Sequence, residues 1–132
     1  MKWLAMIVSM APALVAADIE PEFYVCGPYI QASLVGEPTK QGWPVVLRLT
    51  DAGARAFEGF TAANQGQVVR VVVGEQVFSR ATVNSAMAGG RLRGVFGSER
   101  EARVWWQRLA AKVPEAPCGA PGSPEWRNGL QG

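Results

Sequence analysis

Strand-like and helical patterns follow one another in an order that restricts the fold more than any other feature of the sequence. Short runs of alternating or β-branched apolar residues occupy residues 23–26, 29–35, 43–49, 68–73, 76–83 and 92–96. Helical spacing of apolar residues follows the third run and again the sixth. The resulting order, β-β-β-α-β-β-β-α, predicts an α+β domain in which two α-helices pack on one face of an antiparallel or mixed β-sheet.

Two pairs of neighbouring strands are expected from local signals. Residues 29–35 alternate, with Ile30, Ala32 and Leu34 on the predicted apolar face, and we expect them to pair antiparallel with residues 43–49. Gly74 and Glu75 separate two β-branched runs. Glycine at the first central position suits a two-residue type II′ turn, so these runs are predicted to form a hairpin.

Each predicted helix begins with a capping residue. Thr50 or Asp51 caps the first helix, on which Gly53, Phe57 and Phe60 share one side. The second opens with the S-x-x-E capping box of Ser98 and Glu101. Its apolar spacing predicts a helix that continues until Pro114 ends it, through Ala102, Trp105, Trp106, Leu109 and Val113.

The two ends of the chain have compositions unlike the middle. Residues 1–17 combine an early Lys2, an apolar run and a small-residue end, which is the layout of a secretory signal peptide. A membrane anchor is the alternative, but the uncharged stretch contains Pro12 and is shorter than the roughly 17 to 25 residues of a spanning helix. Residues 114–132 are rich in proline and glycine, and we expect a mostly disordered tail held at most by Cys118.

Cys26 and Cys118 are the two cysteines of the chain. In an oxidising compartment such a pair favours a disulfide, whereas in the cytosol it more often means two buried thiols. With the leader, the pair predicts a periplasmic protein in which a disulfide ties the tail to the first strand. An uncleaved signal anchor is the alternative location.

The chain contains no histidine, and this excludes much catalytic chemistry. Ser-His-Asp and Cys-His nucleophile arrangements and the usual zinc sites lose their central residue. Glu99 and Glu101 are two residues apart, so on a helix they point in different directions. We therefore expect no catalytic residue, cofactor or metal, and no enzyme. A formal net charge of +2 gives no general attraction to nucleic acid.

Gly53 has two interpretations. A phosphate-binding loop carries clustered glycines before the helix and a Lys or Ser/Thr after them, whereas Gly53 is alone inside the first turn. It lies on the same side as Phe57 and Phe60, so we interpret it as a packing position where the helix approaches the sheet closely.

Residues from Ala32 to Val113 resemble a known family, the head subdomain of the first periplasmic domain of SecD and SecDF. The order and spacing of small, polar and aromatic residues carry the resemblance, above all at Thr50, Gly53, Phe57, Asn64, Ser79, Asn84, Gly94 and Phe96. The family usually has an Asp-Gly hairpin turn where this chain has Gly74-Glu75. The base subdomain and transmembrane segments of SecD are not matched.

The resemblance implies a head-like domain over residues 18–113 and a non-enzymatic role in contacting polypeptide during protein export. Sec translocon components or extended polypeptides are then the expected partners, with no nucleic acid and no membrane span after signal cleavage. The alternative is a stand-alone envelope module or inhibitor unrelated to translocation. Arg91, Arg93 and a partly exposed Trp105 are the candidate contact residues. Solvated edge charges and core packing of the tryptophan are the competing interpretations.

Overall fold

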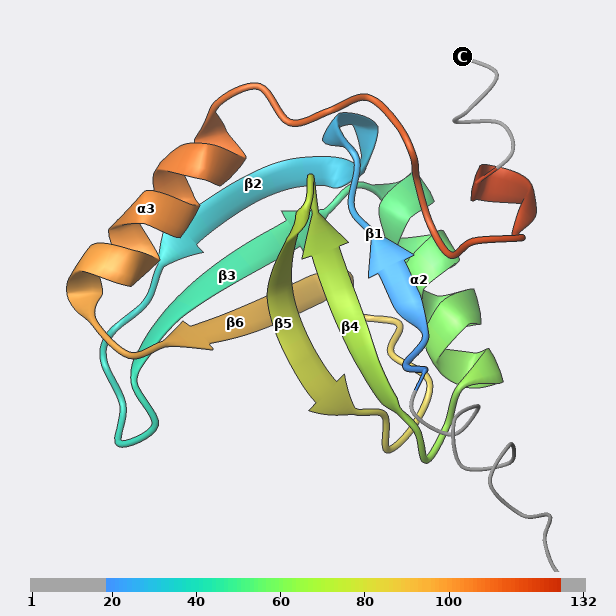
Figure 1. The fold of residues 1–132 in the computed structure, drawn as a ribbon, viewed down its shortest axis with the longest axis horizontal. Coiled ribbons are helices and arrows are strands. Elements are labelled where there is room, and N and C mark those ends of the chain that lie inside the picture. Colours follow the sequence, from blue (N-terminus) through green and yellow to red (C-terminus); the bar gives the residue numbers. More distant parts are fainter. Residues whose placement is uncertain (1–18, 127–132) are drawn as a thin grey trace, which may run out of the picture.

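The computed structural model describes residues 19–126, so the predicted signal peptide and the last residues of the tail lie outside the described residues (Figure 1). The elements in chain order are β1 (Glu22–Tyr24), the short 3-10 helix η1 (Gly27–Tyr29), β2 (Ile30–Val35), β3 (Trp43–Leu49), α2 (Asp51–Ala63), β4 (Val68–Val73), β5 (Gln76–Thr82), β6 (Arg91–Phe96) and α3 (Glu99–Ala110).

The strands form two sheets of three strands each. One has the order β1-β4-β5, with β1 parallel to β4 and β5 antiparallel to it. The other has the order β2-β3-β6 and is antiparallel throughout. The predicted α+β class, with mixed and antiparallel pairing, is confirmed. The division into two sheets is a feature that strand patterns alone do not reveal, because β3 pairs with β6 across α2 and the β4–β5 hairpin.

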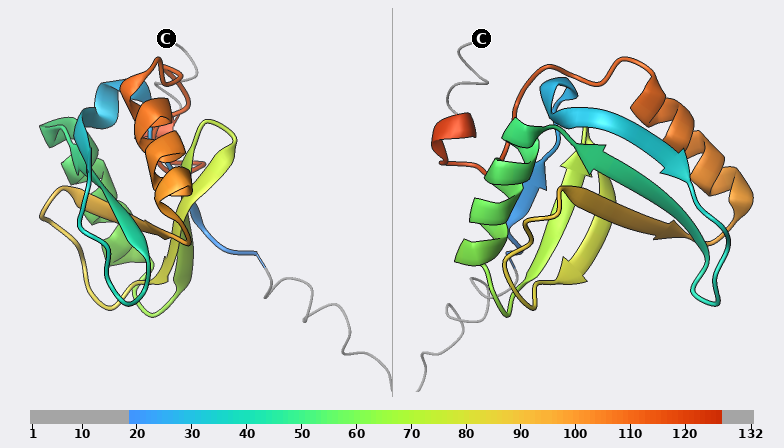
Figure 2. Two further views of the ribbon diagram at one scale, coloured as in Figure 1. Left: turned by 90° about the vertical axis from the view of Figure 1, so that its left-hand side faces the viewer. Right: turned by 180° about the vertical axis from the view of Figure 1, so that it is seen from behind.

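The core lies between the two sheets. The sheet β2-β3-β6 contributes the alternating Val45, Leu47 and Leu49 of β3, and β4 contributes Val69, Val71 and Val73 from the opposite side. All six side chains are buried. Figure 2 shows the two sheets in different layers, with α3 beside β2, β3 and β6.

Helix α2 begins where the sequence indicated. The Thr50 hydroxyl oxygen accepts a hydrogen bond from the backbone N–H of Gly53 at 3.3 Å and donates one to the carbonyl of Pro28 at 3.0 Å. The rings of Phe57 and Phe60 pack on Phe23 of β1, at centroid distances of 5.0 and 5.4 Å. This cap and this aromatic cluster fix α2 against η1 and β1.

Helix α3 begins with the predicted Ser98 cap but ends earlier than predicted. The Ser98 hydroxyl oxygen accepts from the N–H of Glu101 at 3.1 Å. The helix stops at Ala110, and Ala111 is already extended, whereas the apolar spacing predicted a helix up to Pro114. The chain leaves the helix early because residues 111–118 must return to Cys26 and the start of η1, where the N–H of Gly27 donates to the carbonyl of Pro114 at 2.8 Å.

The apolar face predicted for β2 is wrong. Ala32 and Leu34 are exposed, and Leu34 is 54% accessible, whereas Ser33 and Val35 are partly buried. The pairing with β3 shifts between Ile30 and Ala32, which indicates a bulge. An extra residue in one strand reverses the faces of all residues beyond it.

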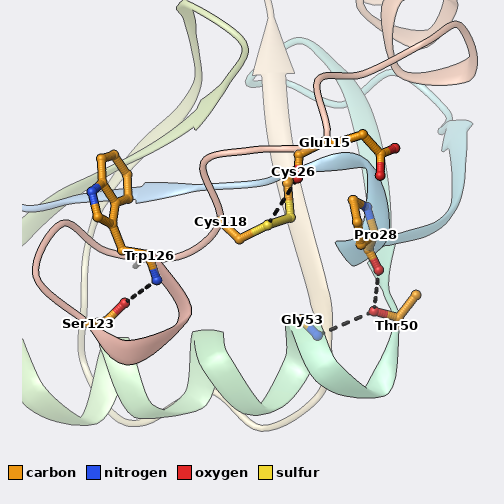
Figure 3. The surroundings of a disulfide bond; sticks show 8 residues. All are labelled: Cys26, Pro28, Thr50, Gly53, Glu115, Cys118, Ser123 and Trp126. Atoms are coloured by element: carbon orange, nitrogen blue, oxygen red, sulfur yellow. Dashed lines mark hydrogen bonds between the residues drawn. A yellow bond between two sulfur atoms is a disulfide. The ribbon is translucent and has the colours of Figure 1, made fainter. Parts of the chain in front are cut away.

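The predicted disulfide joins Cys26 and Cys118 and holds the tail on β1 (Figure 3). The tail also makes contacts that were not expected. Tyr24 and Gly119 exchange two backbone hydrogen bonds of 2.9 and 2.8 Å, and the Trp126 ring packs edge-on against Tyr24. The described part of the tail is therefore fixed by backbone pairing and ring packing as well as by Cys118.

Candidate functional site

The free edge of β6 is the first component of the candidate site. β6 pairs with β3 on one side only. On its other side it passes close to β5, as Figure 1 shows, but within residues 19–126 no backbone hydrogen bond joins the two strands. A strand edge of this kind presents unpaired N–H and C=O groups that another extended chain can use.

The edges at β1 and β2 differ from the edge of β6, because another part of the chain contacts each of them. At β1 the edge pairs with Gly119 of the tail. At β2 the indole N–H of Trp106 donates to the carbonyl of Ser33 at 3.2 Å. The edges of β5 and β6 have no such cover among the described residues, and they face a common cavity.

The second component is this apolar cavity of about 180 Å³. It lies between β6 and the β4–β5 layer, with lining contributed by Phe57, Val69, Val71, Val83, Met87 and Leu92. Ser79 and Ala81 of β5 also border it, as do Arg91 and Arg93 of β6. The cavity is smaller than the roughly 300 to 1,000 Å³ of typical small-molecule pockets, and is closer in size to one large side chain.

Gly94 brings β6 and β5 together at one end. A Cβ built on Gly94 would lie 2.8 Å from the carbonyl oxygen of Phe78, so any side chain there would force the strands apart. Phe78 and Phe96 fill the space beyond, with ring centroids 6.0 Å apart. The cavity therefore lies along the β6 edge on the side of Arg91, away from this close contact.

Arg91 and Arg93 alternate with the buried Leu92 and Gly94, and both arginines are exposed. They share the outer face of β6, as the strand pattern predicted. Arg48 of β3, directly opposite Arg91, joins them on this face. Sequence reasoning missed Arg48 because its position depends on the β3–β6 pairing, which has no local signal.

Trp105 does not have the predicted partial exposure. It is 7% accessible and packs on Phe78 and Phe96 with centroid distances of 5.3 and 5.7 Å. The Arg108 guanidinium covers its ring at 4.7 Å. Core packing, the competing interpretation, describes this residue, and Trp106 is the more exposed of the two at 40%.

The family model described as "SecDF, P1 head subdomain" matches residues 13–104, more than half of the chain. The chain belongs to this family. Among curated proteins, no significant match is found.

Two solved structures share the fold of this P1 head. One, described as "Structure and function of a membrane component SecDF that enhances protein export", is 21% identical with a TM-score of 0.60, over 74% of this chain and 44% of that one. The other, "Crystal structure of SecDF in Super-membrane-facing form", is 22% identical with a TM-score of 0.59, over 72% and 13%. The chain thus spans less than half the length of either solved chain.

Most of the positions on which the resemblance to the P1 head rests serve to cap a helix or to pack the core. Thr50 caps α2, Gly53 and Phe57 are buried on it, and Asn64 donates from Nδ2 to the carbonyl of Phe60 at 2.8 Å. In the second half of the chain, Ser79 borders the cavity, Gly94 closes one end of it and Phe96 stacks on Trp105, whereas Asn84 is exposed.

Within residues 19–126, no group of three or more His, Cys, Asp or Glu side chains is arranged to hold a metal ion. In the same part of the chain, no helix combines the length and apolar character needed to cross a membrane.

Proposed function

We propose that this P1 head-like protein binds extended polypeptide segments in the periplasm, as an accessory to protein export. The observation that carries the proposal is the free edge of β6 beside an apolar cavity. The role is one of binding and needs no catalytic group, cofactor or metal.

The physical basis is strand addition. An extended segment that lies along β6 gains backbone hydrogen bonds without regard to its sequence, and its alternate side chains point to the two faces of the sheet. Side chains on the inner face meet the cavity beside Leu92. This combination suits unfolded clients, because every polypeptide can form backbone hydrogen bonds. A single apolar side chain in the bound segment is then enough to occupy the cavity.

The periplasmic location that we propose for the protein is supported by its sequence and by its family. The predicted signal peptide would export the chain, and the Cys26–Cys118 disulfide suits an oxidising compartment. The solved relative is described as a membrane component that enhances protein export. Sec translocon components are accordingly the partners that we would test first.

The test is an amide chemical-shift titration of the isotope-labelled, oxidised protein with an unfolded secretory polypeptide. We expect shifts along β6 and the cavity-facing part of β5. Ser79→Phe fills the cavity from its border and should weaken binding, whereas Val77→Phe, on the same strand but outside the cavity lining, should not. Absence of shifts in β6, or equal binding by both variants, would contradict the proposal.

A further inference from the structure

Two pairs of arginines lie directly opposite each other on neighbouring strands. Arg70 of β4 faces Arg80 of β5, and Arg48 of β3 faces Arg91 of β6. Like charges in directly opposed positions destabilise a sheet. Nearby negative charge offsets this repulsion, and the two pairs differ in whether the chain supplies it.

The first pair is neutralised by an extended acidic segment of the chain itself. Glu20 accepts hydrogen bonds from Nε of Arg80 at 2.9 and 3.1 Å and lies 3.7 Å from Nε of Arg70. Glu22 lies 2.7 Å from Nη2 of Arg70. The two carboxylates are two residues apart, at the start of the chain segment that becomes β1.

The second pair has no such compensation. Within residues 19–126, the ion pairs involve Arg70, Arg80 and Arg103, and no carboxylate lies within 4.0 Å of Arg48 or Arg91. Arg93, two residues along β6, adds a third positive charge on the same face. Seen from behind in Figure 2, no other element of the described chain lies over β2, β3 and β6.

Apolar side chains adjoin the three arginines on this outer face. Across the sheet, Leu34 pairs with Val46, and Val46 pairs with Arg93. Leu34 is 54% and Val95 40% accessible. Arginine beside exposed apolar surface is a combination found at protein interfaces, where the planar guanidinium group binds carboxylates with two hydrogen bonds.

We propose that the face formed by Arg48, Arg91, Arg93, Leu34, Val46 and Val95, the arginine face, binds an extended acidic segment of a partner protein. Same-face residues of an extended chain repeat about every 6.6 Å, which is the spacing of Arg91 and Arg93 along β6. A segment with acidic residues two apart matches the along-strand spacing of Arg91 and Arg93. On the other sheet, Glu20 and Glu22, also two residues apart, already serve the cross-strand pair of Arg80 and Arg70.

Acidic-segment binding is separable from the polypeptide-binding role proposed for the cavity edge of β6, because Arg48, Leu34, Val46 and Val95 of the arginine face do not border the cavity, whereas Arg91 and Arg93 border it as well. A partner held here could position the protein while the β6 edge stays available. Ser79→Phe changes the cavity and should leave acidic-segment binding intact, so failure of one proposal is distinguishable from failure of the other.

The test measures fluorescence anisotropy of a labelled peptide in which Glu alternates with Val, against the same peptide with Gln in place of Glu. The oxidised protein should bind the Glu peptide at least about tenfold more tightly, the difference expected from one charge-assisted hydrogen bond. The affinity should fall as salt screens the charges.

Variants of the arginines test whether the peptide binds to the arginine face. Arg48→Gln combined with Arg93→Gln should lower the affinity for the Glu peptide at least about tenfold. The matched control is Arg55→Gln with Arg100→Gln, which removes two exposed arginines elsewhere, on α2 and α3, and should leave the affinity unchanged. Equal binding by the two double variants overturns the proposal.

Anionic lipid is the competing ligand, and vesicles containing phosphatidylglycerol form the last arm. Binding to these vesicles that depends on Arg48 and Arg93, without binding to the Glu peptide, overturns the proposal and assigns the face to a membrane surface. Replacement of Arg48, Arg91 and Arg93 by lysine sharpens the distinction. Loss of peptide affinity in the lysine variant supports recognition of carboxylates by the guanidinium fork, because the total charge is unchanged.

Discussion

Gly53 and Tyr29 are so close that a Cβ on Gly53 would lie 2.9 Å from the Cβ and 3.1 Å from the carbonyl oxygen of Tyr29. The same carbonyl accepts a hydrogen bond from the N–H of Thr50 at 2.8 Å. The first turn of α2 is thus held directly on η1. Gly53 serves packing, which is the interpretation that the sequence favoured over an anion-binding loop.

This contact predicts an unusual effect of alanine. Glycine to alanine inside a helix normally stabilises by up to about 1 kcal/mol. Gly53→Ala should instead lower the free energy of unfolding by about 1 to 3 kcal/mol, because its methyl group would crowd the Cβ and the carbonyl oxygen of Tyr29. Gly59→Ala on the same helix is the control, since its Cβ would meet nothing within 4 Å, and it should be neutral or stabilising. Urea denaturation measures both, and a Gly53→Ala protein as stable as wild type would refute the packing role.

Features with a local cause were the ones that sequence predicted well. The Thr50 and Ser98 caps, the Gly74-Glu75 hairpin and the close approach of Gly53 each depend on residues a few positions apart or on one missing side chain. For Gly74 the backbone angle φ is +65°, as a turn of this kind requires.

Features that depend on distant segments were missed. The bulge in β2 places Leu34 outside rather than inside, and no turn residue marks it. The pairing of β3 with β6 places Arg48 opposite Arg91 although most of the chain's middle separates them. The early end of α3 follows from the return of the tail to Cys26, a tertiary constraint that overrides helical spacing.

The disulfide should make a large contribution to stability. Cys26 and Cys118 are 92 residues apart, and closing so long a loop restricts the unfolded chain by about 4 to 5 kcal/mol in the chain-entropy model. Replacement of both cysteines by alanine should lower the free energy of unfolding by roughly this amount. Guanidinium unfolding without reductant measures the loss. Adding reductant to the double variant should change nothing, and a variant as stable as the oxidised protein would contradict the prediction.

The two tyrosines should ionise at unusually high pH in the folded protein. The Tyr24 hydroxyl donates to Oε1 of Glu22 at 2.9 Å, and this hydrogen bond, together with partial burial, raises the pKa of Tyr24. Burial, with a smaller effect of the Glu125 charge, raises the pKa of Tyr29. Tyrosinate absorbance should therefore appear above the usual value of about 10.

Because the two tyrosine pKa values are raised in the folded state, the free energy of unfolding also depends on pH. The contribution is complete below the unfolded pKa of about 10 and is lost as pH rises through the folded pKa of Tyr24 and Tyr29. Glu22→Gln removes the charged acceptor and should lower the pKa of Tyr24 while leaving Tyr29 raised. Two tyrosines that titrate in the native protein as they do in urea would contradict this account.

Glu20 should give the opposite dependence on pH. Its hydrogen bonds from Arg80 lower the pKa of the Glu20 carboxyl, with the charge of Arg70 adding to the effect. A lowered folded pKa stabilises the fold above the unfolded value of about 4.3, and this stabilisation is lost as pH falls through the folded pKa. Glu20→Gln leaves Arg70 and Arg80 opposed with less compensation, so it should destabilise at neutral pH. Thermal unfolding of both proteins from neutral to acidic pH measures the difference. It should shrink with acidity, and a difference that stays constant would show that the Glu20 charge does not compensate this arginine pair.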